Sequence, residues 1–240
     1  MSSPIIDLTS IRYAYPGGPP ILSDLDFHLH ADDRIGIVAP NGSGKTTLFH
    51  IIMGLLKPTA GTVTIFGEVR KEEKDFIDVR RRVGLLFQDA DDQLFSPTVL
   101  EDVAFGPLNL GKNHVDALAV ARRTLSFLGL EGFEDRVTYK LSGGEKRLVS
   151  LATVLAMEPE ILLLDEPSTG LDAATKTALI DILNTLDLSF VLISHEFDFL
   201  SKTAQHIYTM EAGRILLDEE LHIHTHHHAH TMGRQPHRHV

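Results

Sequence analysis

Hydrophobic residues in this chain gather in short continuous runs that do not alternate with polar residues. Four such runs lie at residues 35–39 (IGIVA), 83–87 (VGLLF), 161–165 (ILLLD) and 190–194 (FVLIS). A strand that is apolar at consecutive positions is buried on both faces, as in a parallel sheet covered by helices on each side. The pattern therefore predicts an α/β fold with these four strands in a parallel-sheet core.

Helical periodicity follows the first run. Leu48, Ile51, Ile52 and Leu55 recur at the spacing of one helix face, and Pro58 predicts the point where this helix ends. A glycine-rich segment separates the run from the helix. The sequence thus predicts a strand, a loop and a helix in succession.

The pattern changes between about Gln93 and Pro159, where no clear strand is found. Segments 115–130 and 145–157 carry helical periodicity, and the FGP sequence at 105–107 predicts a turn. We interpret this part of the chain as a helical lobe inserted into the sheet core. The chain contains no internal repeat and no heptad run.

Composition and charge narrow the class of protein. The chain has 240 residues, 43% of them hydrophobic, and no apolar run approaches the roughly 18 residues that a membrane span requires. A formal net charge of -11 speaks against a nucleic-acid-binding surface and against simple attraction to anionic lipid. The lack of cysteine and of a signal-peptide pattern favours a cytosolic protein. Membrane attachment would then depend on a protein partner.

Segment 221–240 is rich in histidine, and its low complexity predicts disorder. Imidazole groups are good ligands for nickel, cobalt, copper and zinc. We consider three interpretations: a native tail that buffers or senses metal, an expression tag, or a segment without a role. Interruptions at Ile223, Thr225 and Ala229 favour the native tail, because tags are normally uninterrupted. Its histidines are His222, His224, His226, His227, His228, His230, His237 and His239.

The segment 35–47 (IGIVAPNGSGKTT) has the spacing of a phosphate-binding loop between a strand and a helix. Backbone N–H groups of a glycine-rich turn form a concave nest for phosphate oxygens, and the positive end of the following helix points to the same place. Lys45 supplies a mobile positive charge, and Thr46 supplies a hydroxyl for Mg²⁺. The candidate ATP-binding residues of this loop are Asn41, Gly42, Ser43, Gly44, Lys45, Thr46 and Thr47.

Ala39 stands where the usual phosphate-loop pattern has its first glycine. A positive φ at an alanine would cost roughly 1–2 kcal/mol. Hydrogen bonds to a charged phosphate contribute about 1.5–3 kcal/mol each, and several are available. We therefore predict an intact loop with a negative φ at Ala39.

A second candidate anion site is LSGGE at 141–145. Ser142 and Glu145 have the spacing of a capping box that opens a helix. The same serine, with Gly143 and Gly144 at a helix N-terminus, can also bind a γ-phosphate. Both interpretations suit the segment on its own, and its place shortly before the LLLDEP sequence favours phosphate binding.

Taken in order, these motifs resemble those of the ATP-binding cassette (ABC) family. The similarity covers roughly residues 5–217 and includes YAYPGG, APNGSGKTT, LLFQD, LSGGE, LLLDEP, STGLD and LISHE. It implies a P-loop NTPase (RecA-like) core with an antiparallel β subdomain and an inserted helical subdomain, working as a head-to-tail dimer. The implied division is an ATPase domain at 1–220, with its core at 1–90 and 160–220 and its helical subdomain at about 91–159, and a tail at 221–240.

The resemblance also implies roles at the nucleotide. Tyr15 would stack on the adenine ring of ATP. Asp165 would hold Mg²⁺ together with Thr46, and Gln88 would complete the metal shell and touch the attacking water. Glu166 would be the general base that polarises this water.

Further residues would act around the γ-phosphate and across the dimer. His195 would keep the γ-phosphate and the general base in register. Ser142, Gly143 and Gly144 would act on the nucleotide of the partner subunit, and Asp172 would lie in the dimer seam. Whether the dimer is formed by identical chains stays open.

Segment 87–111 is similar to the ATPase components of energy-coupling factor importers, which take up vitamins and transition metals. The family receives its transmembrane partner on this surface, which implies a peripheral protein on the cytoplasmic face of the inner membrane. Together with the histidine-rich tail, the similarity favours an ATP-hydrolysing subunit for nickel or cobalt uptake.

Two alternatives stay open: an ATPase for vitamins or other substrates, and a non-transport ABC ATPase, which the lack of a long coiled coil and of a basic surface disfavours. The presence of Glu166 and His195 speaks against a nucleotide-binding scaffold without turnover. Two residues depart from the family pattern. Ala90 replaces a usual proline. Lys146 stands where glutamine is common, and we expect this substitution to alter the dimer interface more than the chemistry.

Overall fold

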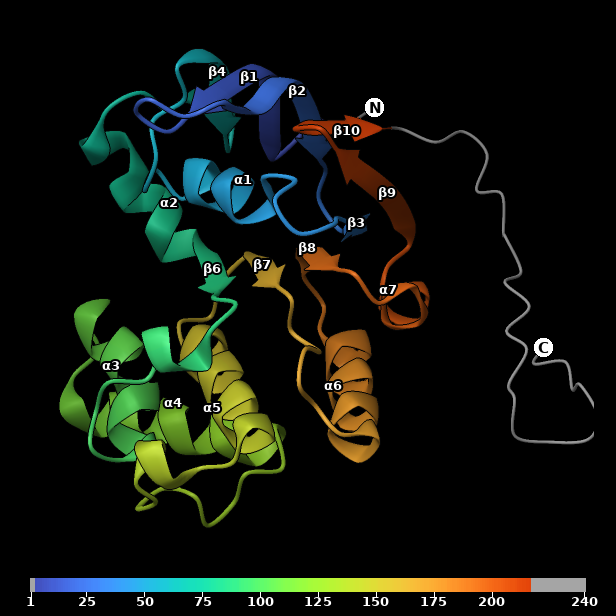
Figure 1. Cartoon of the computed structure of the whole chain (residues 1–240). Helices are drawn as coiled ribbons and strands as arrows, with labels where there is room; N and C mark the ends of the chain where they lie inside the picture. The colour runs from blue at the N-terminus through green and yellow to red at the C-terminus, as the bar shows by residue number, and fades with distance from the viewer. Residues whose placement is uncertain (1–2, 217–240) are drawn as a thin grey trace, which may run out of the picture.

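The computed structural model describes residues 3–216, so the predictions for segment 221–240 lie outside the described residues. It contains a six-stranded sheet in the order β10-β9-β3-β8-β7-β6 and a four-stranded sheet in the order β2-β1-β4-β5 (Figure 1). The strands are β1 (Ile6–Ala14), β2 (Pro20–Leu29), β3 (Arg34–Val38), β4 (Ala60–Ile65), β5 (Glu68–Val69), β6 (Val83–Leu86), β7 (Ile161–Asp165), β8 (Ser189–Ser194), β9 (His206–Glu211) and β10 (Arg214–Leu216). The helices are α1 (Lys45–Ile52), α2 (Phe76–Arg82), α3 (Val99–Asn109), α4 (His114–Phe127), α5 (Gly143–Leu155), α6 (Ala173–Thr185) and α7 (Phe197–Thr203).

The six-stranded sheet contains the four predicted strands as β3, β6, β7 and β8, paired in parallel. Two strands that the hydrophobic pattern did not predict extend it: β9 pairs with β3 in parallel, and β10 adds an antiparallel edge. On β7, Ile161 and Leu163 pack into one hydrophobic core, whereas Leu162 and Leu164 pack into another. The continuous apolar runs are thus explained by burial of both faces of the sheet.

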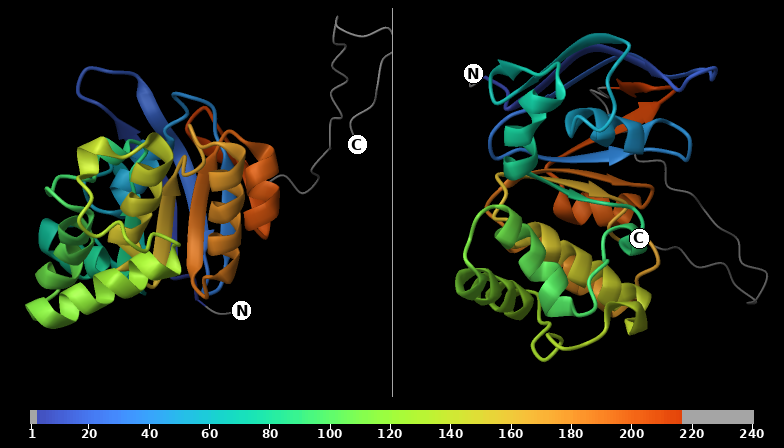
Figure 2. Two further views of the ribbon diagram at one scale, coloured as in Figure 1. Left: turned by 90° about the horizontal axis from the view of Figure 1, so that it is seen from below. Right: turned by 90° about the vertical axis from the view of Figure 1, so that its left-hand side faces the viewer.

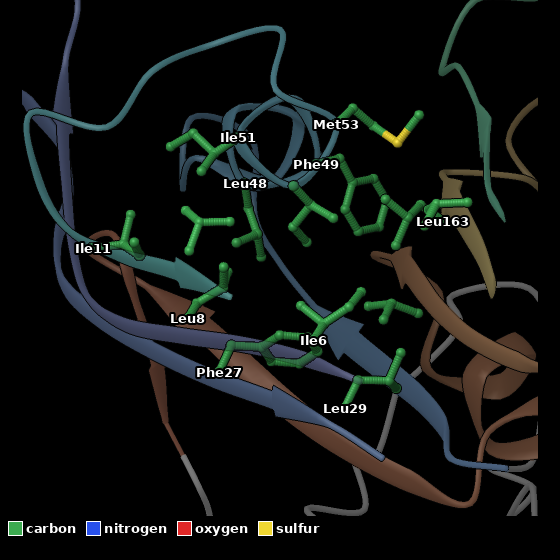
Figure 3. Close-up of a cluster of buried hydrophobic side chains, with 14 of the residues drawn as sticks. Ile6, Leu8, Ile11, Phe27, Leu29, Leu48, Phe49, Ile51, Met53 and Leu163 are labelled. Atoms are coloured by element: carbon green, nitrogen blue, oxygen red, sulfur yellow. The ribbon is translucent and has the colours of Figure 1, made fainter. Parts of the chain in front are cut away.

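The first core lies between the two sheets and surrounds α1. Figure 3 shows Leu48 and Phe49 of α1 beside Ile6 of β1 and Leu163 of β7. All four side chains are fully buried. This packing holds α1, and therefore the loop that precedes it, firmly between the antiparallel sheet and the central sheet.

The second core lies on the opposite face of the six-stranded sheet. Helices α3, α4 and α5 form a lobe on that side, and α6 and α7 lie beside it (Figure 2). Phe190 and Leu192 of β8 point into this core, whereas their neighbours Val191 and Ile193 point into the first one. The predicted α/β fold with an antiparallel sheet and a group of helices is confirmed.

The predicted end of α1 at Pro58 is wrong, because the helix ends at Ile52. Gly54 adopts a φ of +69°, and the chain reverses there as Leu55 N–H donates to the His50 carbonyl and Gly54 N–H donates to the Ile51 carbonyl. This is a glycine-ended C-cap of the Schellman type. A Cβ at Gly54 would lie 2.2 Å from the Phe76 ring, so close packing also demands glycine. Consequently Leu55 leaves the apolar face of the helix and is half exposed.

The predicted turn at residues 105–107 is also wrong, because this segment lies inside α3. A capping box between Thr98 and Glu101 starts the helix. Pro107 removes one helical N–H, but the buried side chains on this helix, such as Val103, offset that local cost. A Cβ at Gly106 would lie 2.6 Å from Met157, so this glycine permits α3 to pack closely on the end of α5.

Within residues 3–216, no helix combines the length and the apolar character of a membrane span.

Candidate functional site

The carboxyl end of β3 leads directly into the predicted phosphate loop. Gly42 and Gly44 adopt φ values of +80° and +100°, which side chains rarely allow. Space lies open beside Gly42, whereas a Cβ at Gly44 would come within 2.7 Å of Leu22. Gly44 caps α1 without a side chain, so the N–H groups of the first turn have no side-chain acceptor at the cap. These features form a cradle for an anion at the helix N-terminus.

The predicted negative φ at Ala39 is confirmed, because Ala39 is not among the residues with positive φ. Its side chain is fully buried in the core around α1. Further along the loop, the Ser43 hydroxyl is buried and has no hydrogen-bond partner within residues 3–216. A buried hydroxyl of this kind suits a phosphate oxygen as its partner.

Lys45, Glu166 and His195 form a compact cluster at the start of α1. The Lys45 ammonium group lies 2.6 Å from Glu166 Oε1, and His195 Nδ1 lies 2.8 Å from Glu166 Oε2. Asn41 accepts a further hydrogen bond from Lys45 at 3.2 Å, and the Thr169 hydroxyl donates to Glu166 Oε2 at 3.1 Å. Glu166 is 1% exposed, whereas His195 faces solvent. Residues from three separate chain segments therefore meet at this cluster.

Thr46 and Asp165 supply oxygen atoms that fit Mg²⁺. The Thr46 hydroxyl donates to Asp165 Oδ2 at 2.7 Å, where the end of β7 approaches α1. The other carboxylate oxygen, Asp165 Oδ1, is buried and lacks a partner in the described part of the chain. Hydroxyl and carboxylate oxygens are the ligand types that Mg²⁺ prefers. The donor set and the unpaired oxygen therefore agree with the predicted metal role.

The pKa values of the two carboxylates at the end of β7 are shifted in opposite directions. Burial raises the pKa of Asp165, against the opposing effect of the Thr46 hydrogen bond. Burial would also raise the pKa of Glu166, but the hydrogen bond and charge of Lys45, helped by His195, outweigh it and lower that pKa. Glu166 is accordingly charged at neutral pH, as a general base must be.

The predicted adenine contact and the predicted glutamine lie at the edges of this cluster. The Tyr15 hydroxyl lies 3.5 Å from the Thr47 hydroxyl, and the half-exposed Tyr15 ring packs edge-on against Tyr13. Gln88 is exposed and lines a hollow of about 250 Å³ that it shares with Gly143. Within residues 3–216, no hydrogen bond joins Gln88 to the Thr46 and Asp165 pair.

The LSGGE segment forms the predicted capping box. Ser142 N–H donates to Glu145 Oε2 at 2.7 Å, and Glu145 N–H donates to the Ser142 hydroxyl at 3.4 Å. The Arg136 guanidinium also donates to Glu145 at 2.8 Å, and this contact and the Ser142 N–H lower the pKa of Glu145 to about 2. A Cβ at Gly143 would meet open space. Ser142 and Gly143 are exposed, and in the described residues no hydrogen bond joins the segment to Lys45.

Two other predicted dimer residues have contacts within the chain. Asp172 caps α6 by accepting from Thr175 N–H at 2.9 Å, and Thr175 in turn lies beside Gly144. Lys146 forms an ion pair with Asp91 at the rim of the hollow that holds Gln88. Lys146, which departs from the family pattern, therefore contacts the segment that follows Gln88.

Sequence reasoning missed Thr169 and Arg147. Thr169 lies within the STGLD motif, of which only Asp172 was assigned a role, and its hydroxyl donates to Glu166. Arg147 is 4% exposed and donates to three backbone carbonyls near Glu166 and Gln88. The available signal was a charged residue at helical spacing with buried Ser150 and Leu151.

A comparison with protein families and a comparison with named proteins agree with this geometry. The model of the family described as ABC transporter matches residues 22–169. A protein of Nitratidesulfovibrio vulgaris assigned as an ABC transporter ATP-binding protein is 50% identical over 228 residues, which cover 94% of this chain and 84% of the relative. The energy-coupling factor transporter ATP-binding protein EcfA of Methanothermobacter thermautotrophicus is 42% identical, with coverages of 89% and 70%. The cobalt import ATP-binding protein CbiO of Rhodobacter capsulatus is 41% identical, with coverages of 90% and 79%.

Solved structures share the same fold. CbiO1 from Clostridium perfringens, described as part of the ABC transporter complex cbiONQ, superposes with a TM-score of 0.81 at 30% identity and covers 90% of this chain and 88% of its own. A dimeric ATP-binding cassette, MJ0796, in a post-hydrolysis state with ADP and Pi, gives a TM-score of 0.80 at 26% identity, with coverages of 88% and 96%.

Proposed function

This chain belongs to the ABC transporter family as an ATP-hydrolysing subunit close to the energy-coupling factor ATPases, and we propose that it drives uptake of nickel or cobalt. The observation that carries the catalytic part of the proposal is the meeting of Lys45, Thr46, Asp165, Glu166 and His195 at the N-terminus of α1. These residue types at this position suit positioning and charge neutralisation during phosphoryl transfer.

Each residue of the cluster has a distinct task in hydrolysis. The phosphate loop would bind the β- and γ-phosphates, with Lys45 as the mobile positive charge. Thr46 and Asp165, with Gln88 completing the shell, would hold Mg²⁺, which neutralises developing charge on the phosphates when bound. Glu166 would take a proton from the attacking water, and His195 would fix the orientation of this carboxylate.

The contact between Lys45 and Glu166 would change when ATP binds. Lys45 has three N–H donors, and two of them go to Glu166 and Asn41. A γ-phosphate bound by the same ammonium group would share its charge and weaken the contact with Glu166, while His195 and Thr169 keep the position of this carboxylate. Glu166 would then be better placed to orient water when ATP is bound.

The exposure of Ser142 and Gly143 in the LSGGE segment supports a dimer in which each chain completes the other chain's site. Ser142 and Gly143 face solvent and contact no residue of the Lys45 cluster within the described chain. In a head-to-tail dimer, these residues would approach the γ-phosphate bound by the partner chain. Two cassettes of similar fold, both versions of MJ0796, are described as dimeric.

A groove between the core and the helical lobe supports docking of a membrane protein. It holds about 300 Å³ and is lined by apolar side chains that include Leu55, Phe87 and Met157. Phe95 and Phe105 stand at this groove with 65% and 47% exposure and pack edge-on at 4.7 Å. Exposed aromatic pairs beside an apolar groove are typical anchors of protein interfaces.

Substitution of Phe95 tests the docking surface. In complexes co-expressed with the membrane proteins encoded beside this chain, Phe95→Ser should reduce co-purification at least about tenfold. Basal ATPase activity of the isolated chain should stay unchanged. Phe127→Ser, at a half-exposed aromatic of α4 outside the groove, is the matched control. Equal co-purification of both variants would place the membrane partner elsewhere.

The metal cargo is supported by the histidine-rich segment 221–240 and by the similarity to a cobalt import ATP-binding protein. Within residues 3–216, no group of three or more His, Asp or Glu side chains is placed to hold a metal ion. Removal of residues 221–240 should therefore abolish nickel and cobalt binding by the isolated chain, measured by calorimetry, and leave basal ATP hydrolysis intact. Metal binding by the shortened chain would overturn the assignment to the tail.

Uptake by the complete transporter tests the cargo itself. Cells or vesicles that contain this chain and its membrane partners should accumulate nickel or cobalt only when ATP is supplied. A transporter that ignores both metals and takes up a vitamin would retain the ATPase assignment but replace the cargo.

A further inference from the structure

A buried arginine on α5 links the LSGGE helix to the carboxylate cluster. Arg147 lies in the second turn after the Ser142 cap and is 4% exposed. Its guanidinium donates to the backbone carbonyls of Phe87, Asp165 and Glu166. Residues 3–216 contain no carboxylate within ion-pair distance of it.

Such burial has an electrostatic cost. Burial lowers the pKa of Arg147, while the nearby charges of Asp165, Glu166 and Asp89 act in the opposite direction. A buried cation held only by carbonyl oxygens is weak support for stability, because an apolar side chain of similar volume often packs at least as well. The position of the three carbonyls suggests a different reason for the arginine.

All three carbonyls belong to backbone that carries a candidate site residue. Phe87 directly precedes Gln88, and Asp165 and Glu166 are themselves in the site. Glu166 adopts a φ of +49°, a left-handed conformation that a non-glycine residue keeps only when its surroundings enforce it. Its N–H donates to the Ile193 carbonyl at 2.9 Å, and its carbonyl accepts from Arg147. The peptide groups on both sides of Glu166 are therefore held.

We propose that Arg147 is a positioning residue that keeps Glu166 and the segment bearing Gln88 in register with the LSGGE helix. Ser142 and Arg147 lie on the same helix, so a displacement of its first turns moves the guanidinium and the carbonyls bound to it. The planar guanidinium suits this task because its rigid fork of N–H groups reaches several acceptors at once. The inference rests on the proposed role of Glu166 as the base.

Two substitutions of Arg147 in the full-length chain test the proposal. Arg147→Met keeps an unbranched chain without N–H groups, and we expect kcat for ATP hydrolysis to fall about 100-fold, the loss typical of a misplaced catalytic group. KM for ATP should stay within about threefold, because the phosphate loop is untouched. Arg147→Lys, which restores the charge without the fork, should recover part of the loss. Arg123→Met, at an exposed arginine of α4, is the matched control and should keep wild-type kcat.

A double mutant separates positioning from general damage. Arg147→Met in the Glu166→Gln background should cause little further loss of kcat, because the group it positions is already removed. A normal kcat in folded Arg147→Met, a rise in KM alone, or fully additive losses would each overturn the proposal. If Arg147→Met does not fold, wild-type kcat in Arg147→Lys overturns it.

The same experiment distinguishes this inference from the proposed function. If Glu166→Gln retains turnover, the base lies elsewhere and the proposed catalytic role itself fails. If Glu166→Gln abolishes turnover while Arg147→Met hydrolyses ATP normally, only the positioning role is lost.

Discussion

The two predicted anion-binding regions of this chain differ in how their polar groups are hydrogen-bonded. Around α1, Lys45 and Glu166 are buried, and their charges meet each other across 2.6 Å. At the start of α5, Ser142 is exposed, and its hydrogen bonds are made to Glu145 within its own capping box. One region is enclosed by the fold, and the other is displayed on its surface.

The difference teaches why the proposed site would need two chains. The buried half would bind phosphate and polarise water, but within residues 3–216 no residue of the LSGGE segment hydrogen-bonds to it. The exposed half has a rigid helix N-terminus with open space beside Gly143, which suits an anion brought by another molecule. Substitutions in the two regions should therefore affect different steps.

The largest effect is expected in the buried half. Glu166→Gln removes the proposed general base while keeping the shape of the side chain, so kcat for ATP hydrolysis should fall about 10²–10⁴-fold. ATP binding should persist, measured by calorimetry with the magnesium salt. Glu158→Gln changes the same charge at the surface and should keep wild-type turnover. Turnover retained in Glu166→Gln would show that another group activates water.

The next effect is expected in the exposed half. Ser142→Asp keeps a good helix cap but places a negative charge where the partner's γ-phosphate would approach. ATP hydrolysis should fall about 100-fold or more, comparable to losing one transition-state donor. ATP binding to the phosphate loop of the same chain should change little.

Ser142→Ala is the control for the structural role of this serine. It removes the cap and should lower the free energy of unfolding by about 1 kcal/mol, measured by urea denaturation. Ser142→Asp should unfold at nearly the wild-type urea concentration. Normal hydrolysis and normal ATP-dependent dimerisation in Ser142→Asp would mean that this segment does not act on the partner's nucleotide.

The smallest effect concerns the pH dependence of stability in the exposed half. The pKa of Glu145 is about 2 in the folded chain, below its ordinary value of 4.5. A lowered pKa means that the charged carboxylate stabilises the folded chain above about pH 4.5, and that this contribution is lost as pH falls from 4.5 towards 2. Because Arg136 is partly exposed and screened by solvent, we expect only about 1 kcal/mol.

Glu145→Gln measures this contribution directly. Glutamine keeps the capping-box hydrogen bonds and removes the charge. The difference in free energy of unfolding between wild type and variant should therefore be larger at pH 6 than at pH 3. A difference that does not change with pH would mean that the ion pair with Arg136 contributes nothing measurable.

Much of the fold could be predicted because its signals are local in the sequence. The four apolar runs became parallel strands, since burial on both faces requires consecutive apolar residues. The end of α1 was misplaced because Pro58 is a weaker signal than the glycine cap at Gly54. Strands β9 and β10 were missed because most of their side chains are partly buried or exposed and form no apolar run.

The candidate site was predicted from motifs, but its contacts were not. Sequence order indicated that Lys45 and Glu166 serve one nucleotide, yet it did not predict that they pair with each other. Arg147 was missed because its acceptors are backbone carbonyls, which every residue possesses and no motif marks.

The sequence by itself determined the types of group available: a glycine-rich cradle, one mobile lysine, two adjacent carboxylates and a capped helix with two glycines. Only the tertiary structure decided which of them meet, because strands far apart in the chain deliver their carboxyl ends to one edge of the sheet. It also left Ser142 at the surface while burying Glu166. Burial and distance are properties of the packed chain, and they decide which charges are paired and which must find a partner elsewhere.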